Sequence, residues 1–313
     1  MSQPKPIIID CDPGIDDAVA LLMAMAIESL QIQAITTVAG NLPVDITQTN
    51  ARALVDLAQR SDLKVYAGCP RPLLRSAIWA SHVHGDNGLG GVTLPAPQLP
   101  LQPSHGVTAL IETLRQAPEP VTLATLGPLT NVAVALVQAP DITTKIQEIV
   151  IMGGAMRAGN VTPSAEFNFY ADPHGAQVVM TSGVPLTLIG LDVTHQVIAT
   201  PPRIERIQAL NNRASTVVAA MIGNYGASDQ ETLGLVGPPL HDPCVIAYLL
   251  QPDLFETKPG FVAIETASDL NLGRSVVDFQ GLMDQPPNAN VALSVDSVGF
   301  YELLLEALAK YSP

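Results

Sequence analysis

Short apolar runs alternate with segments of helical periodicity over much of the chain. The runs lie at residues 6–10, 32–38 and 121–126, and the helical patterns that follow them lie at 16–29, 45–59 and 129–137. Further runs at 146–152 and 185–191 are continuous rather than alternating, which is typical of parallel strands covered on both faces. The pattern predicts an α/β fold with a single open, mostly parallel sheet flanked by helices.

Two long segments depart from this alternation. Residues 68–104 are rich in Pro and Gly, and residues 153–172 are polar without periodicity. Loops of this length are uncommon in compact domains and are more often functional than not. Helical patterns return at 201–226, at 244–250 and at 296–310, where the chain predicts a capped C-terminal helix. With no internal repeat or linker visible, we expect a single domain over 1–313.

Composition narrows the class of protein. Hydrophobic residues make up 47% of the chain and charged residues 14%, which predicts a compact globule with a large core. The net charge of −14 disfavours nucleic-acid polymers and anionic membranes as partners. No secretory signal or membrane span is visible. The three scattered cysteines suit a reducing compartment, so we expect a cytoplasmic protein.

Four carboxylates crowd the junction between the first strand and the first helix. They belong to the sequence Asp10-Cys11-Asp12-Pro13-Gly14-Ile15-Asp16-Asp17. Like charges this close destabilise one another's ionised form unless a cation or helix N–H groups compensate. Capping of the helix explains two of these acids but not all four. Because open α/β sheets place their sites at the carboxyl ends of strands, the motif indicates a hard-metal site.

A second enzyme class also begins with Asp-x-Asp after a first strand. In the aspartate-nucleophile phosphatases, the first Asp attacks phosphorus with the support of Mg²⁺. Those enzymes usually continue with Gly and a Thr or Val, whereas this chain continues with Pro-Gly-Ile-Asp-Asp. The phosphatase is therefore kept as an alternative.

Other polar residues complete the candidate site. His241 and Asp242 stand before a helical pattern, where an imidazole and a carboxylate can act as an acid and a metal ligand. The loop from Gly159 to Asn168 offers amide and carboxylate groups that suit a ligand with several hydroxyls. His82 and His84 lack nearby cysteines or a third histidine for a zinc site, so we expect one of them to face a pocket. His105, His174 and His195 receive no functional role.

These motifs together resemble the inosine-uridine preferring nucleoside hydrolases over essentially the whole chain. The resemblance rests on the acidic motif and on Ala39-Gly40-Asn41, His84-Gly85-Asp86, Met152-Gly153-Gly154, Ala165-Glu166-Phe167-Asn168 and His241-Asp242-Pro243. It implies a Rossmann-like fold and an enzyme that hydrolyses the bond between ribose and a nucleobase. In detail the chain is most similar to the bacterial pyrimidine-leaning ribonucleoside hydrolases.

The resemblance also implies roles for single residues. It implies a Ca²⁺ held by Asp12, Asp17, Asp242 and the main-chain carbonyl of Leu126, where the family often has Thr. Oxygen ligands of mixed kind suit this ion. The implied substrate residues are Asp16, Asn41, His84, Met152, Asn160, Glu166, Asn168 and Tyr225.

The implied reaction uses Asp12 as the base for a calcium-bound water, while His241 hydrogen-bonds or protonates the departing base. Tyr225, Asp229, Gln230 and His84 are candidates for selecting the base, and uridine and cytidine are the favoured substrates, with inosine as a further one. A homotetramer or dimer is implied as well. A non-catalytic nucleoside-binding protein is the remaining alternative, because a fold does not by itself imply turnover.

Overall fold

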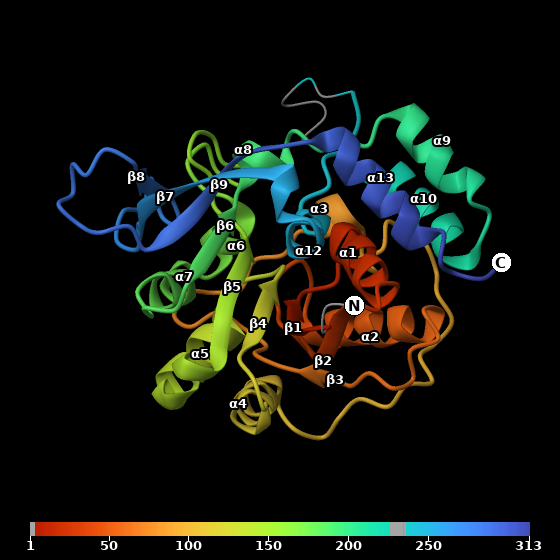
Figure 1. The fold of residues 1–313 in the computed structure, drawn as a ribbon, viewed down its shortest axis with the longest axis horizontal. Coiled ribbons are helices and arrows are strands. Elements are labelled where there is room, and N and C mark those ends of the chain that lie inside the picture. Colours follow the sequence, from red (N-terminus) through yellow and green to blue (C-terminus); the bar gives the residue numbers. More distant parts are fainter. Residues whose placement is uncertain (1–3, 226–233, 235) are drawn as a thin grey trace.

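The computed structural model describes residues 4–225, 234 and 236–313. The described strands form a nine-stranded sheet in the order β3-β2-β1-β4-β5-β6-β9-β7-β8 (Figure 1). Neighbours from β3 to β9 are parallel, whereas β7 pairs antiparallel with both β9 and β8. The strands are β1 (Lys5–Cys11), β2 (Leu30–Thr37), β3 (Val65–Ala67), β4 (Val121–Thr125), β5 (Ile146–Met152), β6 (Leu186–Ile189), β7 (Phe255–Ile264), β8 (Ser275–Asp278) and β9 (Ala289–Val295).

The central strands are apolar because helices cover both of their faces. Ile7 and Ile9 of β1 belong to the core on one side of the sheet, and Ile8 belongs to the core on the other. Side chains of a strand alternate between faces, so a strand between two cores needs apolar residues at successive positions. The prediction of an open, mostly parallel sheet flanked by helices is confirmed.

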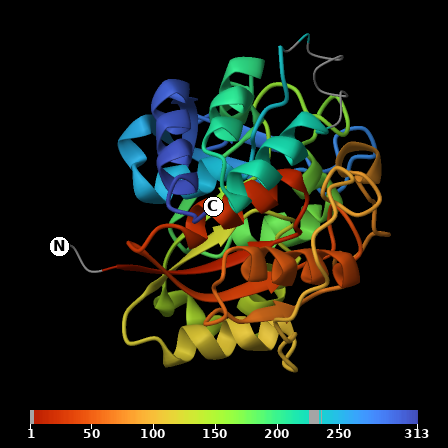
Figure 2. The ribbon, with the colours of Figure 1, turned by 90° about the vertical axis from the view of Figure 1, so that its right-hand side faces the viewer.

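Figure 2 shows the two helical layers, with α4 below the sheet and α10 and α13 above it. Residues of α1, α2, α10, α12 and α13 form one core, and residues of α4, α5 and α7 form the other. The helices are α1 (Ile15–Met25), α2 (Val44–Leu57), α3 (Ser81–His84), α4 (Gly106–Gln116), α5 (Thr130–Gln138), α6 (Phe167–Ala171), α7 (Pro173–Met180), α8 (Leu191–Thr194), α9 (Pro201–Ala209), α10 (Arg213–Gly223), α12 (Pro243–Leu250) and α13 (Ser297–Leu308), with 3₁₀ turns η1 (Pro140–Lys145) and η2 (Pro252–Leu254).

Several elements differ in extent from their sequence patterns. The first helix ends at Met25 rather than at residue 29, because the chain must turn before β2 begins at Leu30. The helical pattern at 201–226 forms two helices, α9 and α10, separated at Asn211, whose φ is 49°. Asn212 then caps α10 by accepting a hydrogen bond from the Ser215 N–H at 2.9 Å.

The two long segments without periodicity lie near the carboxyl ends of the central strands, and they contain the short helices α3 and α6. Because the carboxyl ends of parallel strands meet at one edge of a sheet, this edge also holds the acidic motif that follows β1. Cys11, Cys69 and Cys244 are buried and unpaired. Among the described helices, none is long and apolar enough to cross a membrane.

Candidate active site

A cavity of about 350 Å³ opens beside the carboxyl ends of β4 and β5. Its lining contains every substrate residue predicted from the sequence, together with His241, Leu126 and Asp242. Segments far apart along the chain therefore meet in one hollow. The predicted substrate residues in the lining are Asp16, Asn41, His84, Met152, Asn160, Glu166, Asn168 and Tyr225.

Asp12 is hydrogen-bonded to Asn41, which lines the cavity, and it is closely flanked by two glycines. Its Oδ2 accepts a hydrogen bond from the Asn41 N–H at 2.6 Å. A Cβ added to Gly40 would lie 2.0 Å from Oδ2, and one added to Gly127 would lie 2.4 Å from Oδ1. Oδ1 is buried and makes no hydrogen bond within the described ranges. The two glycines thus let the backbone approach the carboxylate closely while one oxygen stays unsatisfied.

Asp17 links the start of α1 to the loop after β2. Its Oδ1 accepts from the Asp12 N–H at 3.0 Å, and its Oδ2 accepts from the Gly14 N–H at 3.1 Å. The same Oδ2 accepts from the Asn41 side-chain amide at 3.2 Å. Asp17 does cap the helix, as the simpler interpretation of the motif proposes. Capping by Asp17 does not explain why the carboxylates of Asp16 and Asp242 lie beside it.

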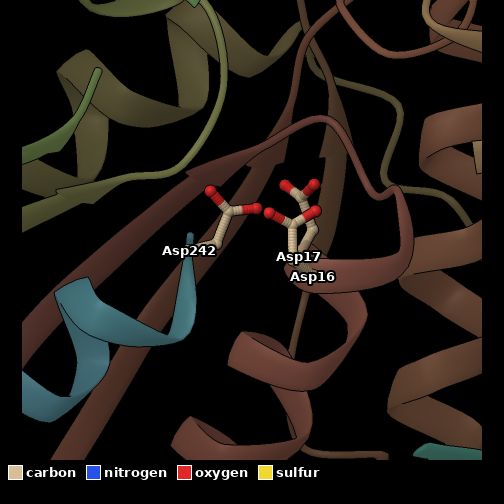
Figure 3. Close-up of side chains that lie close together, drawn as sticks. All are labelled: Asp16, Asp17 and Asp242. Atoms are coloured by element: carbon tan, nitrogen blue, oxygen red, sulfur yellow. The ribbon is translucent and has the colours of Figure 1, made fainter. Parts of the chain in front are cut away.

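Asp16, Asp17 and Asp242 point toward one another across the start of α1 and the residue preceding α12 (Figure 3). Each can offer a carboxylate oxygen such that all three oxygens lie within 4.8 Å of one another. The sequence resemblance placed Asp12 in the metal set and Asp16 in the substrate set. The structure groups Asp16 with Asp17 and Asp242, and it places Asp12 directly against Asp17.

Burial makes this cluster electrostatically costly. Desolvation, followed by the charge of Asp17, raises the pKa of Asp16 to about 7. Desolvation likewise raises the pKa of Asp12 and of Asp242 well above the usual range, with the neighbouring carboxylates adding to it. No ion pair of the described part of the chain includes any of these carboxylates. A bound cation would remove the repulsion, and a set of oxygen donors alone suits a hard cation.

Asn168 and Glu166 organise the opposite wall. The Asn168 amide donates to the Leu126 carbonyl at 2.7 Å and to the Met152 carbonyl at 3.2 Å. Glu166 accepts from the N–H groups of Gly154 and Phe169 through Oε2 and from that of Asn168 through Oε1. Burial raises the pKa of Glu166 to about 7, against the opposing effect of these bonds. The Leu126 carbonyl, which is a predicted metal ligand, is thus joined to Asn168 and Glu166, which are predicted substrate residues, in one hydrogen-bond network.

Histidine and tyrosine side chains lie on the remaining side. His84 Nδ1 accepts from the Ile15 N–H at 3.1 Å, and burial lowers its pKa to about 3, so the ring is neutral with its proton on Nε2. The rings of His84 and Tyr225 lie 5.5 Å apart, and Tyr225 hydrogen-bonds the Asp16 carboxylate. Burial also lowers the pKa of His241 well below its usual value. The candidates Asp229 and Gln230 lie outside the described residues.

The sequence interpretation gave no role to two buried residues that support the site. Thr194 Oγ1 lies 2.7 Å from His241 Nδ1. The Asn131 amide donates to Asp10 Oδ1 at 2.8 Å and holds the end of β1. Both residues follow shortly after the carboxyl end of a strand, β6 and β4, and that position in an open sheet is the one signal that could have identified them.

Comparisons with known proteins agree with this geometry. Residues 7–302 match the family described as inosine-uridine preferring nucleoside hydrolase. The pyrimidine-specific ribonucleoside hydrolase RihA of Salmonella gallinarum is 46% identical over 308 residues, which cover 98% of this chain and 99% of that protein.

Two solved structures have the same fold. A plant nucleoside hydrolase, PpNRh1, superposes with a TM-score of 0.92 at 31% identity and covers 98% of this chain and 99% of its own. A purine-preferring ribonucleoside hydrolase from Gardnerella vaginalis gives a TM-score of 0.91 at 31% identity and covers 97% and 98%. The chain therefore belongs to the inosine-uridine preferring nucleoside hydrolases, enzymes that use water to cleave the N-glycosidic bond of ribonucleosides.

Proposed function

Within this reaction class, we propose that the protein is a calcium-dependent hydrolase that prefers uridine and cytidine and accepts inosine as a further substrate. The observation that carries the proposal is the convergence of Asp16, Asp17 and Asp242 beside a cavity lined by amide, carboxylate and imidazole groups, with Asp12 hydrogen-bonded to Asp17. The preference for pyrimidines is supported by the 46% identity to a pyrimidine-specific relative, against 31% to a purine-preferring one.

The ribose is proposed to bind on the polar side of the cavity. Asp16, Asn41, Asn160, Glu166 and Asn168 line it and offer both donors and acceptors for sugar hydroxyls. Loss of the 2′ hydroxyl would leave buried polar groups without a partner, at a cost of about 1–3 kcal/mol for each. Deoxyribonucleosides should therefore be poor substrates.

Asp12, Asp17, Asp242 and the Leu126 carbonyl are proposed to hold Ca²⁺, with Asp16 close enough to contribute. When bound, the ion would lower the pKa of a water molecule and provide a charge for the vicinal ribose hydroxyls to bind. The fit rests on the buried Asp12 Oδ1, which makes no hydrogen bond among the described residues, and on a ligand set made only of oxygen.

Asp12 is proposed to act as the base. As the C1′–nitrogen bond breaks, its electron pair passes to the nucleobase, and positive charge develops on the ribose ring. The surrounding carboxylates stabilise that charge. The oxygen of the water bonds to C1′, Asp12 takes one of its protons, and His241 stabilises the departing base. The products are ribose and the free base.

The decisive experiment is release of reducing sugar from uridine, cytidine, inosine and deoxyuridine, with and without a calcium chelator. Wild type should release ribose from ribonucleosides, and Asp12→Asn or chelation should abolish it. The exposed Asp253→Asn serves as the matched control and should keep wild-type rates. No release from any nucleoside by wild type in Ca²⁺ would refute the proposal.

Further assays separate the alternative functions. Membership of the family sets the phosphatase interpretation aside, and an assay with p-nitrophenyl phosphate and Mg²⁺ should show no phosphate release. Binding of uridine without ribose release would support the non-catalytic alternative. The homo-oligomeric state and the cytoplasmic location stay predictions, for which size-exclusion chromatography and cell fractionation are the tests.

A further inference from the structure

Thr194 and His241 form a buried side-chain pair beside the cavity. Thr194 is fully buried, His241 is 6% exposed, and Thr194 Oγ1 lies 2.7 Å from His241 Nδ1. We propose that Thr194 is a positioning residue that fixes the His241 ring with its proton on Nε2, so that His241 donates a hydrogen bond to the departing nucleobase. The inference rests on the proposed function for the identity of the leaving group.

The backbone brings the two residues together from distant parts of the chain. The Thr194 N–H donates to the Gly190 carbonyl at 3.1 Å, which anchors Thr194 in the single turn of α8 after β6. The next residues pair with the segment before His241: the Leu240 N–H donates to the Val197 carbonyl at 3.0 Å. This pairing fixes the register between residues 194 and 241 independently of their side chains.

A glycine makes that pairing close. Ile198 and Pro239 form an antiparallel bridge, and the Ala199 N–H donates to the Pro238 carbonyl at 2.8 Å. A Cβ on Gly237 would lie 2.2 Å from the Ala199 carbonyl oxygen, so a larger residue would push the two segments apart. The short contact between Thr194 and His241 is therefore imposed by a rigid local frame.

The number of partners of the Thr194 hydroxyl determines which atom donates in the bond to His241. In the part of the chain that the structure describes, the Thr194 hydroxyl has one hydrogen-bond partner, His241 Nδ1. A buried hydroxyl with one partner satisfies its own proton only by donating, and a buried proton without an acceptor costs about 1–3 kcal/mol. Nδ1 of a neutral imidazole accepts such a bond, and the ring proton then resides on Nε2.

This tautomer suits the departure of a base. When the C1′–nitrogen bond of uridine breaks, the electron pair moves onto the pyrimidine ring, and the Nε2–H group can donate a hydrogen bond to the negative charge that develops. A neutral imidazole held in this way acts as a hydrogen-bond donor without giving up its proton. The water proton goes to Asp12 and later to solvent, so the base acquires its final proton after it departs.

The test compares two leaving groups in Thr194→Val and Thr194→Ser. Uridine needs help at the leaving base, whereas p-nitrophenyl β-D-ribofuranoside releases p-nitrophenolate, which delocalises its own charge. We expect Thr194→Val to lower kcat on uridine by about tenfold to a hundredfold, with KM within about twofold, as for loss of one oriented hydrogen-bond donor. On the nitrophenyl riboside its kcat should stay within about threefold.

Two further variants separate positioning from stability. Thr194→Ser keeps the hydroxyl and should restore uridine hydrolysis to within about threefold of wild type. Tyr311→Phe removes another buried hydroxyl, which donates to the Leu22 carbonyl at 2.7 Å, and should leave both substrates unaffected. Equal losses on both substrates in Thr194→Val would show a purely structural role, and an unchanged rate on uridine would overturn the proposal.

A spectroscopic measurement decides the question without turnover. In ¹⁵N NMR spectra, with the His241 signals assigned by their absence in His241→Asn, wild type should show a protonated Nε2 and an unprotonated Nδ1. Thr194→Val should give a mixture of the two tautomers. A wild-type ring protonated on Nδ1 would overturn the inference. Should wild type release no ribose from any nucleoside, the proposed function fails, and this spectrum still tests the Thr194 pair.

Discussion

Replacing Gly40 by alanine is expected to lower the catalytic rate strongly while the protein remains folded. Gly40 lies beside the Asp12 carboxylate, and a Cβ at this position would be 2.0 Å from Oδ2 and 2.7 Å from a carbon of Pro128. The φ of Gly40 lies outside the left-handed region, so the backbone itself accepts alanine without strain. The effect should therefore arise from the contacts of the added Cβ, of which the one with Asp12 is the shorter.

The magnitude follows from the lack of free space. Contacts of a Cβ are essentially never shorter than 3.0 Å, so the carboxylate or the Gly40 backbone must move by about 1 Å. Asp12 has little room to turn away, because its other oxygen lies close to Gly127, where a built Cβ would be 2.4 Å from Oδ1. Displacing a reacting group by about 1 Å costs roughly 100-fold in rate, while overpacking a buried site costs about 1–3 kcal/mol of stability.

The assay is kcat on uridine, followed by absorbance, together with urea unfolding. Gly40→Ala should lose about 100-fold in kcat while remaining folded. The control is Gly223→Ala at the end of α10, where an added Cβ meets nothing within 4 Å. That variant should keep its kcat within about twofold and gain up to about 1 kcal/mol of stability. A folded Gly40→Ala enzyme with wild-type kcat would refute the idea that the glycines position Asp12.

Three other predictions concern metal, pH and packing. Ca²⁺ at about 100 times its Kd should stabilise the chelator-treated protein by about 2.7 kcal/mol in scanning fluorimetry, and an unchanged Tm would contradict the metal assignment. Burial lowers the pKa of His84 from 6.5 to about 3, so below pH 6.5 the unfolded chain binds a proton at this residue that the folded chain does not, and the contribution of His84 to stability falls by about 2 kcal/mol by pH 5. His84→Gln should lose correspondingly less stability between pH 7 and pH 5 in urea titrations, whereas equal losses would count against this reasoning. Phe169 is fully buried against Gly153 and Gly154, so Phe169→Ala should lower the free energy of unfolding by about 3–5 kcal/mol, as measured by urea unfolding. A smaller loss would show that the neighbouring residues repack into the space.

The central sheet was predictable because its strands are buried on both faces. The run at residues 6–10 and the run at 146–152 are apolar enough to stand out, and both are strands. The antiparallel extension was not predicted. The first half of β7 (Phe255–Ile264) is largely exposed, and β8 (Ser275–Asp278) has only four residues, so neither leaves a clear hydrophobic period.

Many polar residues that line the cavity were named from the sequence as candidates, but their grouping was not predicted. The acidic motif and His241-Asp242 are visible in the sequence; in the structure Asp16, His241 and Asp242 line one cavity, and Asp17 lies beside Asp16 and Asp242. Asp16 lies in the first turn of α1, whereas Asp12 lies in the turn between β1 and α1, so which of them faces Asp242 depends on how that turn and α12 pack together, and no local pattern encodes this. Thr194 escaped notice because its contact depends on a register between two loops, which no local pattern encodes.

The packing of α1 against α12 determines when the site can exist during synthesis. Asp16 and Asp17 emerge from the ribosome early, whereas Asp242 follows only after most of the chain has been made. Contacts of such long sequence separation form late, because loop closure must be completed before they contribute. A nascent chain that ends before α12 therefore holds Asp16 and Asp17 without Asp242, and a cation that needs all three carboxylates would bind only after most of the chain has been made.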